Sequence, residues 1–207
     1  DSPMIIYVDA LKGEQQMITE VVFWDKTKSE LCAPLLDSET LINSQTLRYD
    51  PIESRDINND GIIDIPVQSV NFGKGDNPLT ADTENIYLTE WKSISENGMK
   101  SIMKTIVNYQ DGYMIYLDET DVNTFGIRNY RSQNCWILYS SDKNGGAVTD
   151  LFSVIKVPVS KWNTDKFNAY IPVIEYEDSV VCVYIASDGK RLGIDEEFVK
   201  SKIIKIN

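Results

Sequence analysis

Residues 100–117 read Lys-Ser-Ile-Met-Lys-Thr-Ile-Val-Asn-Tyr-Gln-Asp-Gly-Tyr-Met-Ile-Tyr-Leu, and this stretch holds the clearest fold signal in the chain. Two segments rich in Ile, Val, Tyr and Thr, Lys100–Tyr109 and Tyr113–Leu117, flank the tripeptide Gln110-Asp111-Gly112. β-Branched and aromatic residues favour strands, and an Asp-Gly step favours the tight turn of a β-hairpin. The stretch therefore predicts two antiparallel strands joined at Asp111-Gly112.

The same pattern of short apolar runs cut by Asn, Asp and Gly recurs on both sides of this hairpin. It predicts strands at Met4–Asp9, Met17–Trp24, Thr46–Tyr49, Ile62–Val67, Ile86–Ser93, Cys135–Ser140, Leu151–Val159, Tyr170–Tyr176 and Val180–Ala186. Turns are expected at residues 143–146 and 177–178, and at Asp188-Gly189, where the chain leaves the last of these strands. Helix signals are scarce. Asp195–Lys202 begins with acids, one of them a capping Asp, and ends with lysines, and Thr120–Phe125 is a second candidate. We therefore predict a mainly β or α+β chain with one or two short helices.

Residues 71–85 are polar and contain Gly and Pro, which is typical of a linker or a long loop. We therefore expect two domains. Residues 1–85 would form a β-rich segment, which begins with a hairpin, and residues 86–207 would form an antiparallel α+β domain.

Composition excludes several classes of function. The 207 residues include 20 Lys and Arg, 32 Asp and Glu and no His, which gives a net charge of −12. Without His, no Ser-His-Asp or Cys-His pair and no His-ligated metal can form. Nucleic acid and anionic membranes repel such an acidic chain, so no nucleic-acid partner is expected. No apolar run approaches the roughly 18 residues of a membrane-spanning helix.

One acidic segment has the spacing of a calcium loop: Asp56-Ile57-Asn58-Asn59-Asp60-Gly61-Ile62-Ile63-Asp64-Ile65-Pro66. Ca²⁺ takes about six to eight oxygen ligands, and alternate residues of a tightly wound loop can direct short polar side chains at one centre. Gly61 allows the left-handed turn that such a loop needs. The predicted ligands are four side chains and one backbone carbonyl, from Asp56, Asn58, Asp60, Ile62 and Asp64. The alternative is a polar surface turn in an acid-rich chain.

The loop does not fit an EF-hand. An EF-hand requires a bidentate Glu at position 12 and helices on both sides, but position 12 is Val67 and Pro66 precedes it. The residues that follow the loop are β-rich. We therefore expect a compact calcium loop that leads into a strand, with the ion stabilising the structure.

The segment Asp56–Asp64 and the strand after it resemble the calcium loop of the FG-GAP/VCBS family, found in integrin-like propeller blades and in many secreted bacterial proteins. This resemblance implies that Ile5–Asp9, Met17–Trp24 and Thr46–Tyr49 are strands of a propeller-blade-like segment. A complete propeller needs several blades, so either upstream blades are missing or the loop belongs to another small β domain.

Two further resemblances concern the rest of the chain. Asp56–Pro66, together with Asn108-Tyr109-Gln110-Asp111-Gly112-Tyr113, is similar to segments of cell-envelope or secreted proteins of Gram-positive anaerobes. Tyr109–Leu117, with later strands and a final helix, resembles the opening of PsbP-like domains. That second resemblance implies an antiparallel sheet packed against helices, in a mostly non-catalytic family.

Other candidate residues carry weaker signals. The acidic clusters Glu175, Glu177, Asp178 and Asp118, Glu119, Asp121 could supply a glycosidase pair, but no spacing selects an acid and a nucleophile, so solvated turns are expected. Trp24 and Trp91 have charged neighbours and could line the rim of a sugar site, whereas Trp136 is predicted to be core. Cys135 and Cys182 lie in apolar runs and are expected to be buried thiols.

These observations favour a non-catalytic secreted or cell-surface protein with a structural calcium site. Because the chain starts at Asp1, we expect that a leader or a larger upstream region has been removed, and a lipid anchor could have been part of it. The expected partner is a protein or glycan of the cell envelope. The alternatives are a carboxylate-dependent hydrolase acting on polysaccharide or cell wall, and a sensor lipoprotein or inhibitor domain.

Overall fold

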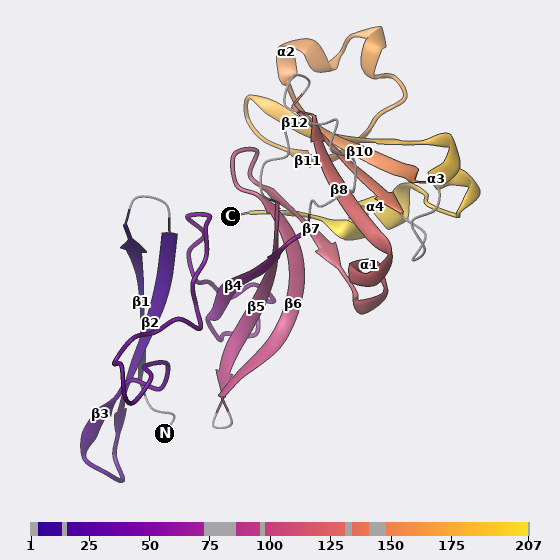
Figure 1. Ribbon diagram of the computed structural model, residues 1–207. Coiled ribbons are helices and arrows are strands. Elements are labelled where there is room, and N and C mark those ends of the chain that lie inside the picture. Colours follow the sequence, from indigo (N-terminus) through magenta and orange to yellow (C-terminus); the bar gives the residue numbers. More distant parts are fainter. Residues whose placement is uncertain are drawn as a thin grey trace. The chain divides into compact units, whose positions relative to one another are not determined.

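The computed structural model describes residues 4–13, 16–72, 86–95, 98–130, 134–140 and 148–206. Within these residues the chain is mainly β, with thirteen strands in three antiparallel sheets and four short α-helices (Figure 1). This confirms the predicted mainly β or α+β class. The expected turn at residues 143–146, residues 73–85 of the expected linker and the start of the chain at Asp1 lie outside the described residues.

The chain groups into two compact units. Unit 1 comprises Asp1–Ser69 and Thr89–Lys104, and unit 2 comprises Val70–Leu88 and Thr105–Asn207. The polypeptide passes between the units within strands β4 (Asp64–Asn71), β5 (Tyr87–Ser95) and β6 (Gly98–Asn108). A domain boundary between residues 85 and 86 stays a prediction.

Unit 1 contains a three-stranded sheet made of β1 (Ile5–Lys12), β2 (Gln16–Asp25) and β3 (Glu30–Cys32), in the order β1-β2-β3. Alternate residues in the first part of β2, namely Met17, Thr19 and Val21, are buried, as expected for a sheet with one face on a core. Val21 packs with Leu35 and Ile65 in a small apolar cluster. The predicted hairpin of residues 4–24 is therefore confirmed.

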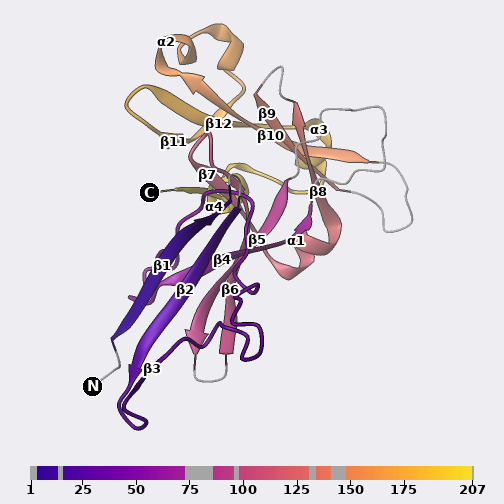
Figure 2. The same cartoon turned by 60° about the vertical axis from the view of Figure 1, so that its left-hand side comes forward.

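Unit 2 contains a five-stranded sheet in the order β11-β12-β10-β9-β8, visible in Figure 2. Its strands are β8 (Phe125–Tyr130), β9 (Cys135–Ser140), β10 (Thr149–Pro158), β11 (Ile171–Glu175) and β12 (Ser179–Ile185). The β9–β10 and β11–β12 pairs are antiparallel, as predicted. Pro172 lies in β11, an edge strand, where a missing N–H is tolerated.

The third sheet has the order β13-β7-β6-β5-β4, where β7 is Tyr113–Leu117 and β13 is Ile203–Lys205. The predicted turn between β6 and β7 is confirmed. Asn108 Oδ1 accepts from the Asp111 N–H at 3.0 Å, and Gly112 has φ +77°. The side chain of Asn108 also donates to Asp111 Oδ2 at 3.0 Å, so the two residues lock the turn reciprocally.

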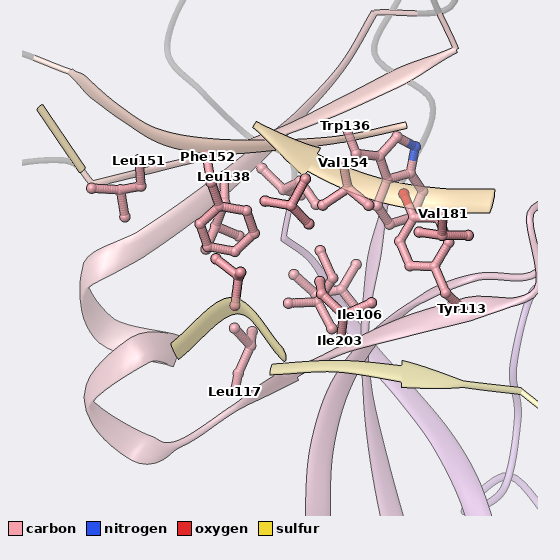
Figure 3. Close-up of a cluster of buried hydrophobic side chains, with 14 of the residues drawn as sticks. Ile106, Tyr113, Leu117, Trp136, Leu138, Leu151, Phe152, Val154, Val181 and Ile203 are labelled. Carbon is pink, nitrogen blue, oxygen red and sulfur yellow. The ribbon is translucent and has the colours of Figure 1, made fainter. Parts of the chain in front are cut away.

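The main hydrophobic core belongs to unit 2. Figure 3 shows Phe152, Val154 and Val181 of one sheet facing Ile106 and Ile203 of the other. Tyr113 packs its ring edge-on against Trp136, with a centroid distance of 5.9 Å. Burying this many large apolar side chains, at about 1.5–3 kcal/mol each, is the main stabilising term of the unit.

The four short α-helices of the described residues all belong to unit 2. They are α1 (Glu119–Thr124), α2 (Val159–Trp162), α3 (Ser187–Arg191) and α4 (Glu196–Lys202), with a 3-10 turn η2 at Asp165–Phe167. Asp118 caps α1, and Asp195 caps α4 by accepting from the Phe198 N–H at 2.9 Å. The two predicted helices are confirmed to within one residue.

The structure corrects three predictions. Thr46–Tyr49 is not a strand. The Thr46 hydroxyl, rather than its backbone, pairs with the backbone of Thr19, so the backbone ladder of a strand does not form there. What remains is one isolated bridge between Arg48 and Met17. The strand expected from Ile62 starts at Asp64. The turn expected at Asp188-Gly189 lies within α3, where Gly189 lets the helix backbone touch Leu151 of β10.

Candidate metal-binding loop

The segment predicted to bind calcium forms a closed loop in unit 1. Arg55 and Asp64 form a reciprocal backbone pair at its base, with N···O distances of 3.0 and 2.8 Å. This bridge brings the residue before the loop next to the last predicted ligand. It is also the point at which the chain enters β4.

Hydrogen bonds from the backbone to side chains wind the loop. Asp56 Oδ1 accepts from the Asp60 N–H at 3.0 Å, and Asp56 Oδ2 accepts from the Gly61 N–H at 2.7 Å. Asp60 Oδ1 accepts from the Ile62 N–H at 2.8 Å. Short Asp and Asn side chains stabilise turns in this way. The side chains of Asn58 and Asp60 also touch, with Asn58 Nδ2 donating to Asp60 Oδ2 at 2.8 Å.

Two residues of the loop adopt left-handed backbone conformations, Asn59 with φ 59° and Gly61 with φ 85°. Among side-chain-bearing residues, Asn tolerates this conformation better than most. The left-handed conformation was predicted at Gly61 but not at Asn59. The residue types therefore match the conformation that the loop requires at both positions.

Asp64 is the distinctive residue of the loop. It is fully buried (0% exposed), yet its Oδ1 has no hydrogen-bond partner. Its other oxygen, Oδ2, accepts from the Ile57 N–H at 3.2 Å. Burial raises the pKa of the Asp64 carboxyl, and the nearby charges of Asp60 and Asp56 raise it further. A buried carboxylate oxygen without a partner is unfavourable, so this atom requires a ligand or a proton.

The start of the loop is anchored to β1. Asp9 Oδ2 accepts from the Ser54 N–H at 2.7 Å, one residue before the Arg55–Asp64 bridge. The fully buried Arg48 donates to Asp9 Oδ1 at 2.7 Å, and Thr19 also bonds to Asp9. No sequence signal pointed to this network, because nothing in the local pattern around Asp9 or Arg48 distinguishes them from surface charges.

The arrangement supplies oxygen ligands and no nitrogen or sulfur ligand. Asp56 is half-buried, Asn58 and Asp60 are exposed, and Asp64 is buried. Among the described residues, no three Asp, Glu or Cys side chains already converge closely enough to hold a metal. Hydrogen bonds join Asn58 to Asp60 and Asp56 to the Asp60 backbone, so three of the predicted ligand residues already lie together within one wound loop.

The tryptophans and cysteines considered as candidates differ in how deeply they are buried. Of the two candidates for the rim of a sugar site, Trp91 is buried in β5 at 2% exposed, whereas Trp24 is 48% exposed. Trp136 is core as predicted, and Cys135 and Cys182 are buried free thiols as predicted. Burial raises the pKa of Cys182 to about 12.

Asp118 and Asp121 were predicted to lie in a solvated turn, and the structure contradicts this prediction. Asp121 is buried, the two residues form a capping box at the start of α1, and both pair with Lys202. Glu175 and Glu177 are exposed, in line with the expected solvated turn.

No protein-family model matches the chain, and no curated protein or solved structure matches it. Within the part of the chain that the structure describes, no helix is both long enough and apolar enough to cross a membrane.

Proposed function

We propose that residues 56–64 bind one Ca²⁺ ion and that this ion stabilises the fold rather than taking part in a reaction. The observation that carries the proposal is Asp64 Oδ1, a fully buried carboxylate oxygen without a partner, at the end of a loop with a calcium-ligand spacing. A bound divalent cation would satisfy that oxygen and neutralise the charges that raise the Asp64 pKa.

The proposed ligands are oxygens of Asp56, Asn58, Asp60 and Asp64 and the carbonyl of Ile62. This set of hard, partly anionic oxygens suits Ca²⁺ better than a soft metal. The loop lacks the bidentate Glu of an EF-hand, and three of its ligand residues are exposed. Both features favour a weak site with a dissociation constant of about 10⁻⁴–10⁻³ M, as in extracellular modules.

This weak affinity supports placing the protein outside the cell, because external calcium is millimolar in many habitats. We therefore infer a non-catalytic secreted or cell-surface binding module, with a protein or glycan of the cell envelope as its partner. The ion would hold the Arg55–Asp64 bridge closed and so fix the start of β4. No described cluster of carboxylates favours the hydrolase alternative over this function.

Thermal unfolding in calcium and in chelator, combined with titration calorimetry, tests the proposal. At about 100 times its dissociation constant, a ligand stabilises a protein by about 2.7 kcal/mol, so a clear rise in Tm with calcium is expected. Asp60→Ala should abolish both the heat of binding and the rise in Tm.

Asp37→Ala is the matched control. Asp37 also caps an exposed turn by accepting from two backbone N–H groups, those of Glu39 and Thr40, but it lies outside the motif. Its replacement should lower stability slightly and leave the calcium response intact. A wild-type Tm that is the same in calcium and in chelator would show that the loop is only a surface turn.

A further inference from the structure

The two units differ in how much apolar surface their described residues bury. In unit 1 the buried apolar side chains are Met17, Val21, Leu35, Ile52, Ile65 and Trp91, and all the other buried apolar side chains described lie in unit 2. The main cluster, part of which Figure 3 draws, has every one of its described members in unit 2. Because burial of apolar surface is the dominant favourable term in folding, unit 1 has much the smaller share of it.

Unit 1 fills much of its interior with polar side chains instead. Those described as buried are Thr19, Asn43, Thr46, Arg48, Asp64, Gln68, Thr89 and Ser93, and they outnumber the buried apolar ones of this unit. A buried polar group favours folding only while its hydrogen bonds are made, and an unpaired one opposes burial. Arg48 donates from three nitrogens, whereas Asp64 keeps one oxygen without a partner. The stability of unit 1 therefore depends strongly on Asp64.

Asp64 lies directly beside the apolar cluster of unit 1. The next residue of β4 is Ile65, which is also 0% exposed and packs with Val21 of β2 and with Leu35. Tyr7 of β1 packs on the same cluster. The contacts between the three-stranded sheet and β4 thus begin one residue after a buried carboxylate oxygen without a partner. Without a cation, opening of unit 1 gives that oxygen water, so its buried position favours the open state.

Strand β6 marks where such an opening would stop. Residues 99–104 belong to unit 1 and are exposed or half-buried, whereas residues 105–108 belong to unit 2 and are all buried. Ile106 is part of the main core of unit 2. Regions with few buried apolar contacts open at a lower free energy than the rest of a protein. The first part of β6 can therefore open while the last part stays packed.

We propose that calcium controls the folding of unit 1 alone, so that unit 1 opens at low calcium while unit 2 stays folded. This inference rests on the proposed calcium site and names what that site regulates. An ion held by the loop Asp56–Asp64 supplies the missing partner of Asp64 only in the closed state. It therefore lowers the population of the open state by the factor 1 + [Ca²⁺]/Kd, which is about 100 at 100 times the dissociation constant.

Hydrogen exchange of the full chain, followed by mass spectrometry, tests the proposal, with titration calorimetry on the same sample to measure calcium binding. The two conditions are chelator and about 10 mM calcium, roughly 100 times the lower end of the expected dissociation constant. In chelator, amides of β2 and of residues 64–69 should exchange about 100-fold faster than in calcium. Amides of β10 and β12 should keep their protection, and within β6 the calcium effect should end near Lys104.

Two variants separate the ion from the carboxylate. Asp60→Ala removes an exposed ligand, so in calcium its unit 1 should exchange like that of the wild type in chelator. Asp64→Asn removes the buried charge and keeps the side-chain shape, so in chelator its unit 1 should be better protected than the wild type and should not respond to calcium. Asp37→Ala, outside the motif, should keep the full calcium response.

The possible failures are distinguishable. Absence of any heat of calcium binding would overturn the proposed calcium site, and this inference with it. Calcium binding that leaves the exchange of unit 1 unchanged, or that protects both units equally, would overturn this inference and leave the calcium site standing. An Asp64→Asn variant that is no better protected than the wild type in chelator would also overturn it, because the unpartnered carboxylate would then not favour opening.

Discussion

Arg48 Nη2 donates to Asp9 Oδ1 at 2.7 Å across 39 residues of sequence, and the Arg48 side chain is fully buried. Its other donors are also used, since Nε donates to the Ile52 carbonyl at 2.5 Å and Nη1 to the Thr19 hydroxyl at 2.8 Å. Because Asp9 also holds Ser54, this ion pair connects β1 to the base of the candidate calcium loop.

Replacing Arg48 by Met should lower the free energy of unfolding by about 3–5 kcal/mol, because Asp9 is left without its cation. Urea unfolding measures the loss. Lys28→Met serves as the control, since Lys28 pairs with Asp25 on the exposed surface and such pairs contribute little. The double variant Arg48→Met, Asp9→Leu should be less destabilised than Arg48→Met alone. If Arg48→Met and Lys28→Met lowered the free energy of unfolding equally, the Arg48–Asp9 pair would contribute no more than an exposed surface pair.

The Asp9 carboxylate should also make the free energy of unfolding depend on pH. Burial by itself raises the pKa of Asp9, but hydrogen bonds from Thr19, Ser54 and Arg48 outweigh burial and lower the pKa below its ordinary value. A group whose pKa is lower in the folded state contributes stability above its unfolded pKa and loses it as the pH falls through the folded value. The stability difference between wild type and Asp9→Asn should therefore shrink below about pH 4. Urea unfolding from neutral to acidic pH checks this, and a difference that grows on acidification would contradict it.

Gly61→Ala should weaken calcium binding and lower stability by about 1–2 kcal/mol, because the backbone is left-handed there and an L-residue is strained in that conformation. A Cβ at Gly61 would meet no atom within 4 Å, so the effect comes from the backbone alone. Gly13→Ala is a matched control, with φ 74° and equally open space, in the turn between β1 and β2. Both variants should lose similar stability in chelator, but only Gly61→Ala should change the heat of calcium binding. Identical calcium titrations for the two variants would place the ion elsewhere.

Lys202→Met should destabilise unit 2 by about 3–5 kcal/mol, since Lys202 is buried and pairs with both Asp118 and Asp121 at the start of α1. Lys200→Met, two residues earlier on α4, removes an exposed pair with Glu196 and should change stability by at most about 0.5 kcal/mol. Chemical unfolding of the two variants side by side makes the comparison. A mild effect of Lys202→Met would mean that the neighbouring rings of Tyr116 and Phe198, rather than the carboxylates, hold this lysine.

Local sequence signals predicted much of the secondary structure because the forces behind them are local. The alternation in Met17–Trp24, the Asp111-Gly112 turn and the capping residue Asp195 each act within a few residues. The same holds for the winding of the candidate loop, where Asp56 and Asp60 bond to backbone groups two to five residues away. Predictions that depended on distant partners were less successful: Thr46 pairs with Thr19 through its hydroxyl, and Asp121 pairs with Lys202 instead of facing water.

The sequence by itself determined the β-rich class, the hairpins, the helix caps and an all-oxygen set of candidate ligands, since a chain without His leaves few others. Only the tertiary structure decided which charges are buried and that Asp64 holds one oxygen without a partner. The physical reason is that burial, unlike a turn or a cap, depends on residues far away in the chain. Arg48 and Lys28 look alike in the sequence, and only the fold places one in the interior and the other in water.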